Sequence, residues 1–253
     1  MLSDVLIIAG SVLAAVAFLL LVTRASEAHF RKESNDFTGA VVAVIGTTYA
    51  VILAFMLSGV WNLFQQAQVN EEQEANDVIN VFRIGAQLPD ADRIAMQGLA
   101  RDYVERALNV EWPAFERGEI PPDGISIIRN MWNVAGQAEA HSRSDEAVVS
   151  QLMTEISKLT GHRRTRITHA KESLPPILWL VLIAGGVITV AAACLFGVAN
   201  FRFHLLQVLV LSFLLSLVLV AIADIDQPYR GAVKVDPEGF RYAQQTIAAE
   251  STR

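Results

Sequence analysis

The residues that most often carry out catalysis or bind metal ions are few in this sequence and widely spaced. No two histidines lie three or four residues apart, so none can form a paired metal site on a helix. The five are His29, His141, His162, His169 and His204. The only cysteine, Cys194, lies in an apolar run, where we expect it to fill space. Because phosphate-binding glycine loops and nucleophile motifs are also missing from the sequence, it predicts no enzyme, cofactor or metal site.

Charged side chains gather in two stretches that could act on ions. Glu71, Glu72 and Glu74 fall on what we expect to be the exposed side of a helix, and they would form a ring of charge if several copies assembled around a pore. The stretch from His162 to Lys171 is basic and could attract anions. Its arginines are Arg163, Arg164 and Arg166. The alternatives, which are the more common cases, are a solvated helix face and a basic flank against lipid headgroups.

The overall composition limits the class of partner. The formal net charge is -6, which predicts no basic surface for nucleic acid. Hydrophobic residues make up 53% of the chain, and the mean hydropathy is +0.37. That is too apolar for an ordinary soluble domain of this length. The lipid bilayer is therefore the expected partner.

Four long uncharged stretches are expected to carry the chain through that bilayer. They are residues 5–22, 40–61, 177–198 and 205–223. At 1.5 Å per residue the first of them covers about 27 Å, just enough for the hydrocarbon core. The first stretch could instead be a signal peptide, with Ser26-Glu27-Ala28 as a cleavage site. No Lys or Arg precedes it, however, and this favours an uncleaved anchor.

The polar segment between the second and third stretches determines the predicted fold class. We expect an all-α integral membrane protein with four transmembrane helices and a helical domain inserted between helices 2 and 3. The first two spans occupy residues 1–61, and the soluble domain occupies residues 62–174. The last two spans occupy residues 175–223, and a tail occupies residues 224–253.

Capping and turn residues divide the inserted domain. A helix is expected to continue from the second span and to end before Asp90, which should cap the next helix through about Leu108. Residues 111–113 are expected to bend the chain because they include a proline. A further helix is predicted over about 126–140, and Ser144 is expected to cap the last one.

Lysine and arginine near the span ends predict the orientation in the membrane. The side that holds both termini and the inserted domain has eight of them, namely Lys158, Arg163, Arg164, Arg166, Lys171, Arg230, Lys234 and Arg241. The other side has four, namely Arg24, Arg31, Lys32 and Arg202. This excess places the termini and the domain in the cytoplasm.

Small residues line one face of the second span. They recur every three or four positions, as Gly39, Ala43, Gly46, Ala50, Ala54 and Ser58. A face of this kind allows close helix contact in lipid. Packing within the chain is the favoured interpretation, and a subunit interface or a pore lining stays open.

Bulkier residues lie elsewhere on the same span. They are Ile45, Ile52, Phe55 and Met56. A ring of such uncharged apolar side chains could close a pore by excluding water. The alternative is contact with lipid, and periodicity does not decide between the two.

Polar residues follow the last span directly. Asp224 and Asp226 could hold a cation or a partner at the membrane exit, although solvated charges that end a helix are the more common case. Pro228, Tyr229 and Gly231 predict a turn that docks the tail onto the inserted domain.

Three landmarks occur in the same order as in a known family. The first combines Tyr49, Phe55 and Trp61 with the following Ala67, Glu74, Ala75 and Arg83. The second combines Tyr103 with Glu111, Trp112 and Pro113, and the third runs from Asp226 to Gly231. This ordered set covers most of the chain and resembles the bestrophin-like membrane proteins of bacteria.

The resemblance implies a relationship to bestrophins, which are pentameric ion channels with four spans per subunit and cytoplasmic termini. Their second span lines the pore with apolar residues. The resemblance thus implies a homo-oligomer, a pentamer, that passes small ions. Animal bestrophins bind calcium with a dense acidic cluster after the last span. This chain has only Asp224, Asp226, Asp236 and Glu238 there, which puts calcium binding in doubt.

Two functions of different classes follow. The first is a bestrophin-like oligomeric ion channel or pore with an uncharged apolar constriction. The second is a membrane-anchored scaffold or stress-related interaction protein without ion conduction. The predicted spans carry no Asp, Glu, Lys, Arg or His in their interiors, which argues against an ion-coupled transporter. The channel is the leading prediction.

Overall fold

The computed structural model describes residues 2–26, 32, 34–121, 125–138 and 142–251. Within these residues the chain is built from helices and contains no strand. It divides into two compact units, residues 1–62 with 173–226 and residues 63–172 with 227–253. The all-α class and the four apolar helices that were predicted are confirmed.

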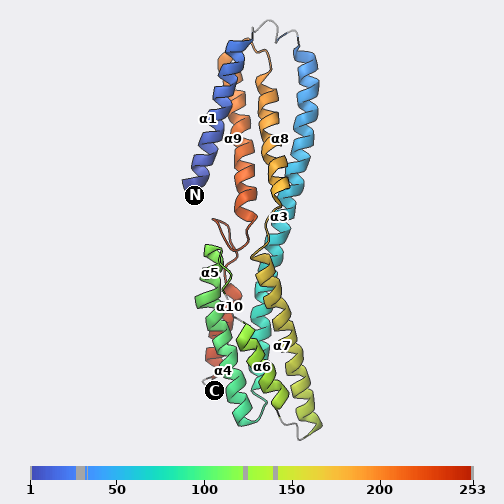
Figure 1. The fold of residues 1–253 in the computed structure, drawn as a ribbon, viewed down its shortest axis with the longest axis vertical. Helices are drawn as coiled ribbons and strands as arrows, with labels where there is room; N and C mark the ends of the chain where they lie inside the picture. Colours follow the sequence, from blue (N-terminus) through green and yellow to red (C-terminus); the bar gives the residue numbers. More distant parts are fainter. Residues whose placement is uncertain (1, 27–31, 33, 122–124, 139–141, 252–253) are drawn as a thin grey trace. The chain divides into compact units, whose positions relative to one another are not determined.

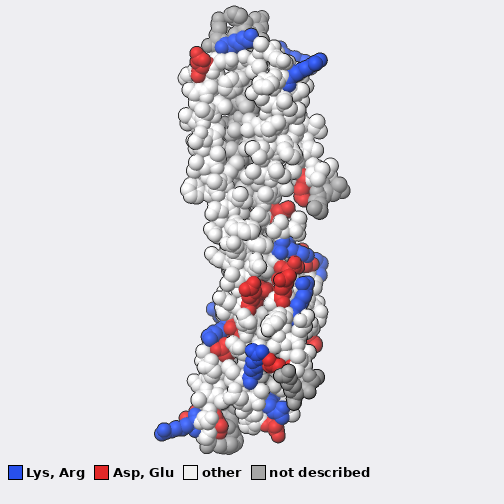
Figure 2. All heavy atoms as spheres, turned by 180° about the vertical axis from the view of Figure 1, so that it is seen from behind, with Lys and Arg blue, Asp and Glu red and all other residues white. Residues whose placement is uncertain are grey.

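The first unit, which we call the span unit, holds the four helices that are long and apolar enough to cross a membrane. They are α1 (Leu2–Ala25), the first part of α3 (Asn35–Gly85), α8 (Pro176–Cys194) and α9 (Phe201–Ile225). Figure 1 shows these helices running alongside one another. On the face drawn in Figure 2, their surface is almost free of charge between its two ends.

Contacts along the spans fix which side of α3 faces inward. Tyr49, Leu53 and Val60 are buried with Leu182 of α8 and Ile222 of α9. The Tyr49 hydroxyl donates a hydrogen bond of 2.6 Å to the carbonyl of Leu182. This bond satisfies a buried polar group where no water is available, so it orients α3 about its own axis.

The connection between α8 and α9 differs from the prediction. The third span was expected to continue to residue 198, but α8 ends at Cys194, and α9 begins at Phe201. Asn200 explains the early start of α9, because its side-chain oxygen accepts hydrogen bonds from the backbone N–H groups of Arg202 and Phe203. Gly197 is also held in place, by a hydrogen bond from its N–H to the side chain of Asn35.

The second unit, which we call the helical domain, contains the end of α3 and, among its described residues, six further helical segments. They are α4 (Asp90–Arg106), the π-helical turn η1 (Ala107–Glu111), α5 (Trp112–Arg117), α6 (Ile125–Gln137), α7 (Arg143–His169) and α10 (Glu238–Ser251). Its core includes Phe82 of α3, Met96 of α4, Met131 of α6, Ile156 of α7 and Phe240 of α10. Charged side chains are frequent on its surface (Figure 2).

Several local predictions for this domain are wrong. Pro89 rather than Asp90 precedes α4 as its cap residue, without a side-chain hydrogen bond. Ser142 rather than Ser144 caps α7, because its hydroxyl accepts from the N–H of Asp145. Residues 111–113 do not interrupt the helical structure, since the chain passes through η1 directly into α5. Pro113 lies in the first turn of α5, directly after the π-helical turn.

The tail after the last span also contains a helix that is not among the predicted elements. Residues 238–251 form α10, which buries Phe240, Ala243 and Ile247 in the helical domain. The indole N–H of Trp112 donates to the carbonyl of Val235, just before this helix. The tail therefore completes the core of the domain.

Candidate functional site

Most of the small face of α3 is not used for packing inside the chain. Ala43, Ala50, Ala54 and Ser58 are exposed, and a Cβ placed on Gly46 would meet nothing within 4 Å. Gly39 is half-buried. The favoured interpretation of this face as intrachain packing is therefore wrong for most of its length, because Tyr49 and Leu53, on an adjacent side of the helix, make the inward contacts. Its roles as a subunit interface or a pore lining stay predictions.

The four bulky residues of the span separate into two groups. Ile52 and Met56 pack against the inner cluster formed around Tyr49 and Leu53, so they are occupied within the chain. Ile45 is half-buried. Phe55, by contrast, is 70% exposed. Of the predicted constriction residues, only Phe55 points away from the body of its own span unit.

The acidic stretch further along α3 is not a solvated face. Glu71 and Glu74 are 1% and 0% exposed, and Asp77 is also buried. Glu72 is exposed. The expectation that these acids share an exposed side is wrong, because positions 71 and 74 fall on the same side of the helix as the buried Ala75 and Val78.

The basic stretch on α7 is likewise turned inward in part. Arg163 is 7% exposed and Arg166 is fully buried, whereas Arg164 is exposed. Two of the three arginines therefore have no surface from which to attract ions. They meet the buried acids of α3 and η1 instead.

These residues form a buried ionic cluster. Arg166 donates to both carboxylate oxygens of Glu74, at 2.7 and 2.9 Å, and to Glu111 at 2.7 Å. Arg163 donates to the other oxygen of Glu111 at 2.7 Å. The hydroxyl of Tyr103 donates to Glu74. The cluster thereby joins α3, α4, η1 and α7.

Aromatic rings enclose the central guanidinium. Its carbon lies 5.3–5.5 Å from the ring centroids of Trp112, Phe115 and Phe240, within the range of cation–π attraction. Tyr229 packs edge-on against Trp112, with ring centroids 5.4 Å apart. The landmark residues Glu74, Tyr103, Trp112 and Tyr229 are therefore parts of one core around Arg166.

Electrostatics keep this cluster charged. Burial lowers the pKa of Arg166, but the carboxylates of Glu74 and Glu111 outweigh it and hold that pKa well above its ordinary value. Burial raises the pKa of Glu111, and the charges of Arg166 and Arg163 more than offset this, so the pKa of Glu111 lies below its usual range. Such mutual compensation indicates a structural centre rather than a proton donor.

The residues after α9 also make internal contacts. Asp226 is 4% exposed, and its carboxylate accepts a hydrogen bond from the N–H of Leu174 at 2.7 Å. The expectation that Asp226 is a solvated charge is therefore wrong. Asp224 is half-buried, and Pro228 is buried. Gly231 has a φ of 86°, in the left-handed region that favours glycine.

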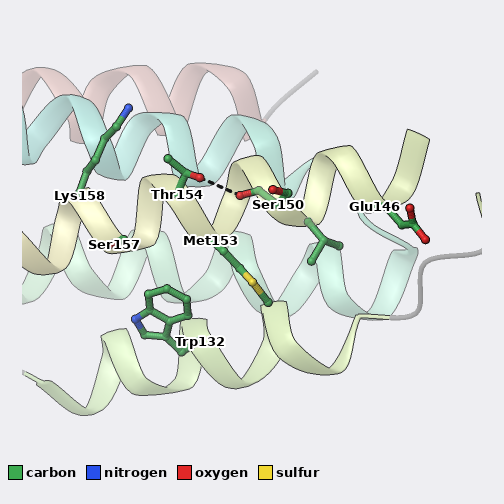
Figure 3. Close-up of a pocket in the computed structure, with 8 residues that line it drawn as sticks. Trp132, Glu146, Ser150, Met153, Thr154, Ser157 and Lys158 are labelled. Atoms are coloured by element: carbon green, nitrogen blue, oxygen red, sulfur yellow. Dashed lines mark hydrogen bonds between the residues drawn. The ribbon is translucent and has the colours of Figure 1, made fainter. Parts of the chain in front are cut away.

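Two of the hollows on the described surface are large enough to consider as sites. One, of about 720 Å³, lies between α6 and α7, and Figure 3 shows Trp132 and Met153 beside it. The other, of about 590 Å³, lies among α1, α8 and α9 and is bordered by Ser11 and Ser216, whose hydroxyls are hydrogen-bonded. In neither case do the lining residues suggest a catalytic arrangement. Among the described residues, no three His, Cys, Asp or Glu side chains gather as a metal site would require.

Comparisons with known proteins agree with this architecture. A bestrophin homologue from Klebsiella pneumoniae, solved by Zn-SAD phasing, matches with a TM-score of 0.71 and 11% identity, over 97% of this chain and 99% of that one. Two variants of that homologue give TM-scores of 0.72, over the same shares at 11% identity, and 0.70, over 95% and 99% at 12% identity. Identities this low show the fold alone. No curated protein sequence gives a significant match.

A family model decides the relationship. The model of the Bestrophin-like domain matches residues 9–240, which is most of the chain. The membrane-spanning helices and the order of the landmark residues agree with that assignment. The chain therefore belongs to the Bestrophin-like family.

Proposed function

We propose that this protein is an oligomeric ion channel in which α3 of each copy lines the conducting path. Membership of the Bestrophin-like family supports a channel rather than an enzyme. The fold of the bacterial bestrophin homologue supports the same conclusion. The scaffold alternative lacks comparable support. We further propose that the copies form a pentamer in the bacterial inner membrane. We also propose that the termini are cytoplasmic, because the basic residues near the span ends favour that orientation.

The outward face of α3 is the observation that carries this proposal. Tyr49, Leu53 and Val60 face the body of the span unit, so the opposite side faces whatever lies beyond the protomer. That side carries Thr47, Val51, Ala54, Phe55 and Ser58, all exposed. In a closed ring of copies in a membrane, a helix face turned away from its own protomer faces the central axis, a neighbouring copy or lipid. An apolar, uncharged wall of this kind suits a pore that closes by excluding water.

Recording from purified protein tests the proposal directly. The wild-type protein should run in mild detergent as a homo-oligomer, with its mass determined by light scattering. The same preparation should then give discrete single-channel currents in a planar bilayer. An intact oligomer that passes no current would favour the scaffold, and a monomer would exclude a pore along α3.

Close contact between copies makes Ala54 sensitive to added bulk. Ala54→Leu should weaken the oligomer, because overpacking a tight contact typically costs about 1–3 kcal/mol. Ala17→Leu is the matched control, since Ala17 is an exposed alanine on α1. Light scattering in detergent should show smaller species for Ala54→Leu only. If both variants keep the wild-type mass, Ala54 does not lie at a subunit contact.

Glu72 is the residue that we expect to set ion preference. Between residues 40 and 82 of α3 it is the only exposed charged side chain among the described residues. A ring of Glu72 carboxylates would raise the local concentration of small cations. Glu72→Gln should therefore move the reversal potential in a KCl gradient towards zero, without abolishing current. Glu146→Gln, an exposed acid on α7, should leave it unchanged, and equal shifts in both variants would exclude a special role for Glu72.

A further inference from the structure

Glu71 is a buried carboxylate without a basic partner. In the described part of the helical domain, the other buried acids each contact a basic side chain. Glu74 and Glu111 contact Arg166, Glu155 contacts Lys158, and Asp77 contacts His162. Glu71 instead accepts hydrogen bonds from the backbone N–H groups of Gly239 and Phe240, at 3.3 and 3.0 Å. Those two N–H groups belong to the first turn of α10.

This contact makes Glu71 the cap of a helix that lies far away in the sequence. The first N–H groups of a helix have no partner within it, and the helix dipole favours a negative charge there. The fit is close, because a Cβ on Gly239 would lie 2.9–3.0 Å from the Glu71 oxygens and 3.1 Å from the Cβ of Ala75. The start of α10 is therefore placed against α3 by one carboxylate.

The remaining contacts of α10 divide into apolar burial and peripheral polar pairs. Phe240, Ala243 and Ile247 are buried. Arg83 and Glu250 form an ion pair at 2.6 Å, but both side chains are partly exposed, and such pairs contribute little to stability. Among the polar contacts of α10, the one made by Glu71 is therefore the one held in the interior.

Several groups surround the Glu71 carboxylate. On α3, Glu74 and Glu72 repel its negative charge. On α7, Arg166 is already engaged by Glu74 and Glu111. Tyr229 precedes α10, and Glu238 in the first turn of α10 is exposed. Burial, with smaller contributions from the two neighbouring glutamates, outweighs the two N–H donors and raises the pKa of Glu71 to about 7.

We propose that Glu71 is a proton-sensitive latch, which holds α10 against the domain when it is protonated and releases its grip as the pH rises through neutrality. This inference is independent of ion conduction. The direction of this pH dependence follows from proton linkage. The docked state binds the Glu71 proton more tightly than a state in which the carboxyl is solvated with its ordinary pKa of 4.5, so docking is strongest below pH 4.5 and weakens as the pH rises to about 7. Between pH 6 and 8 the docking equilibrium should fall about tenfold.

Hydrogen exchange of the α10 amides tests this latch on the full-length protein. Glu71→Gln keeps the shape and a carbonyl acceptor but cannot ionise. At each pH, the exchange rate of residues 240–247 in the wild type is divided by that in Glu71→Gln, so the intrinsic pH dependence of exchange cancels. The ratio should rise about tenfold from pH 6 to pH 8. The same ratio for α6 should stay constant.

Two further variants serve as controls for the exchange experiment. Glu72→Gln, which neutralises the exposed neighbour, should retain most of the wild-type pH dependence. Gly239→Ala should expose α10 at both pH values, because its methyl group occupies the place of the carboxylate. If Glu71→Gln does not fold, the wild-type α10 rate divided by the wild-type α6 rate, each corrected for its intrinsic rate, should show the same tenfold change. A ratio that stays flat between pH 6 and 8 would overturn the proposal.

Discussion

Replacing Arg166 with methionine is expected to lower the free energy of unfolding by about 3–5 kcal/mol. The change removes one partner of a buried ionic cluster and leaves Glu74 and Glu111 without their central cation. Methionine preserves most of the side-chain volume, so the loss reports mainly the stranded charge. The change in the free energy of unfolding is measured by thermal and denaturant unfolding in detergent, followed by tryptophan fluorescence.

Two further variants separate charge from packing. Arg164→Met changes an exposed arginine two positions away and should alter stability by no more than about 0.5 kcal/mol. Combining Arg166→Met with Glu74→Gln removes the stranded charge and should recover part of the loss, since Glu111 keeps its ion pair with Arg163. Equal stability of Arg166→Met and Arg164→Met would show that the cluster is not a centre of the fold.

The spans could be predicted because uncharged runs of sufficient length have few alternatives in a protein. Which side of a span faces inward could not, since both sides of α3 are apolar. Tyr49 decides the matter through a hydrogen bond to a carbonyl 133 residues away along the chain. No residue near the second span in the sequence indicates that partner.

The acids of α3 illustrate a second limit. A run such as Glu71, Glu72 and Glu74 is usually solvated, and burial becomes favourable only when compensating groups are present. Here Arg166 lies 92 residues further on, and the cap on α10 lies still further. The landmark pattern did include Glu74, Tyr103, Trp112 and Tyr229, so the resemblance pointed to the residues of the cluster without indicating their contacts.

One missed element did have a signal in the sequence. Phe240, Ala243 and Ile247 follow one another at spacings of three and four, which is typical of an amphipathic helix. The prediction for the tail, residues 224–253, does not include this helix. The buried side of α10 corresponds to this apolar stripe.

Replacing Phe55 with alanine is expected to raise single-channel conductance several-fold. Phe55 is 70% exposed on the outward face of α3, so its loss should cost the protomer little packing. If that face lines the path, the ring of Phe55 side chains narrows an apolar segment, and a narrow apolar segment blocks ions by staying dry. Removing the rings widens this apolar segment and lets water enter it. Planar-bilayer recording of the wild type beside the variant measures the difference.

A phenylalanine in another span provides the control for Phe55. Phe213 of α9 is 52% exposed and lies on a helix that is not proposed to line the path, so Phe213→Ala should conduct like the wild type. Phe55→Ser should conduct at least as well as Phe55→Ala, because a hydroxyl favours water in the constriction. Ile52→Ala should instead reduce stability, since Ile52 packs against the inner cluster. If Ile52→Ala opened the channel and Phe55→Ala did not, the inward side of α3 would be the one that faces the path.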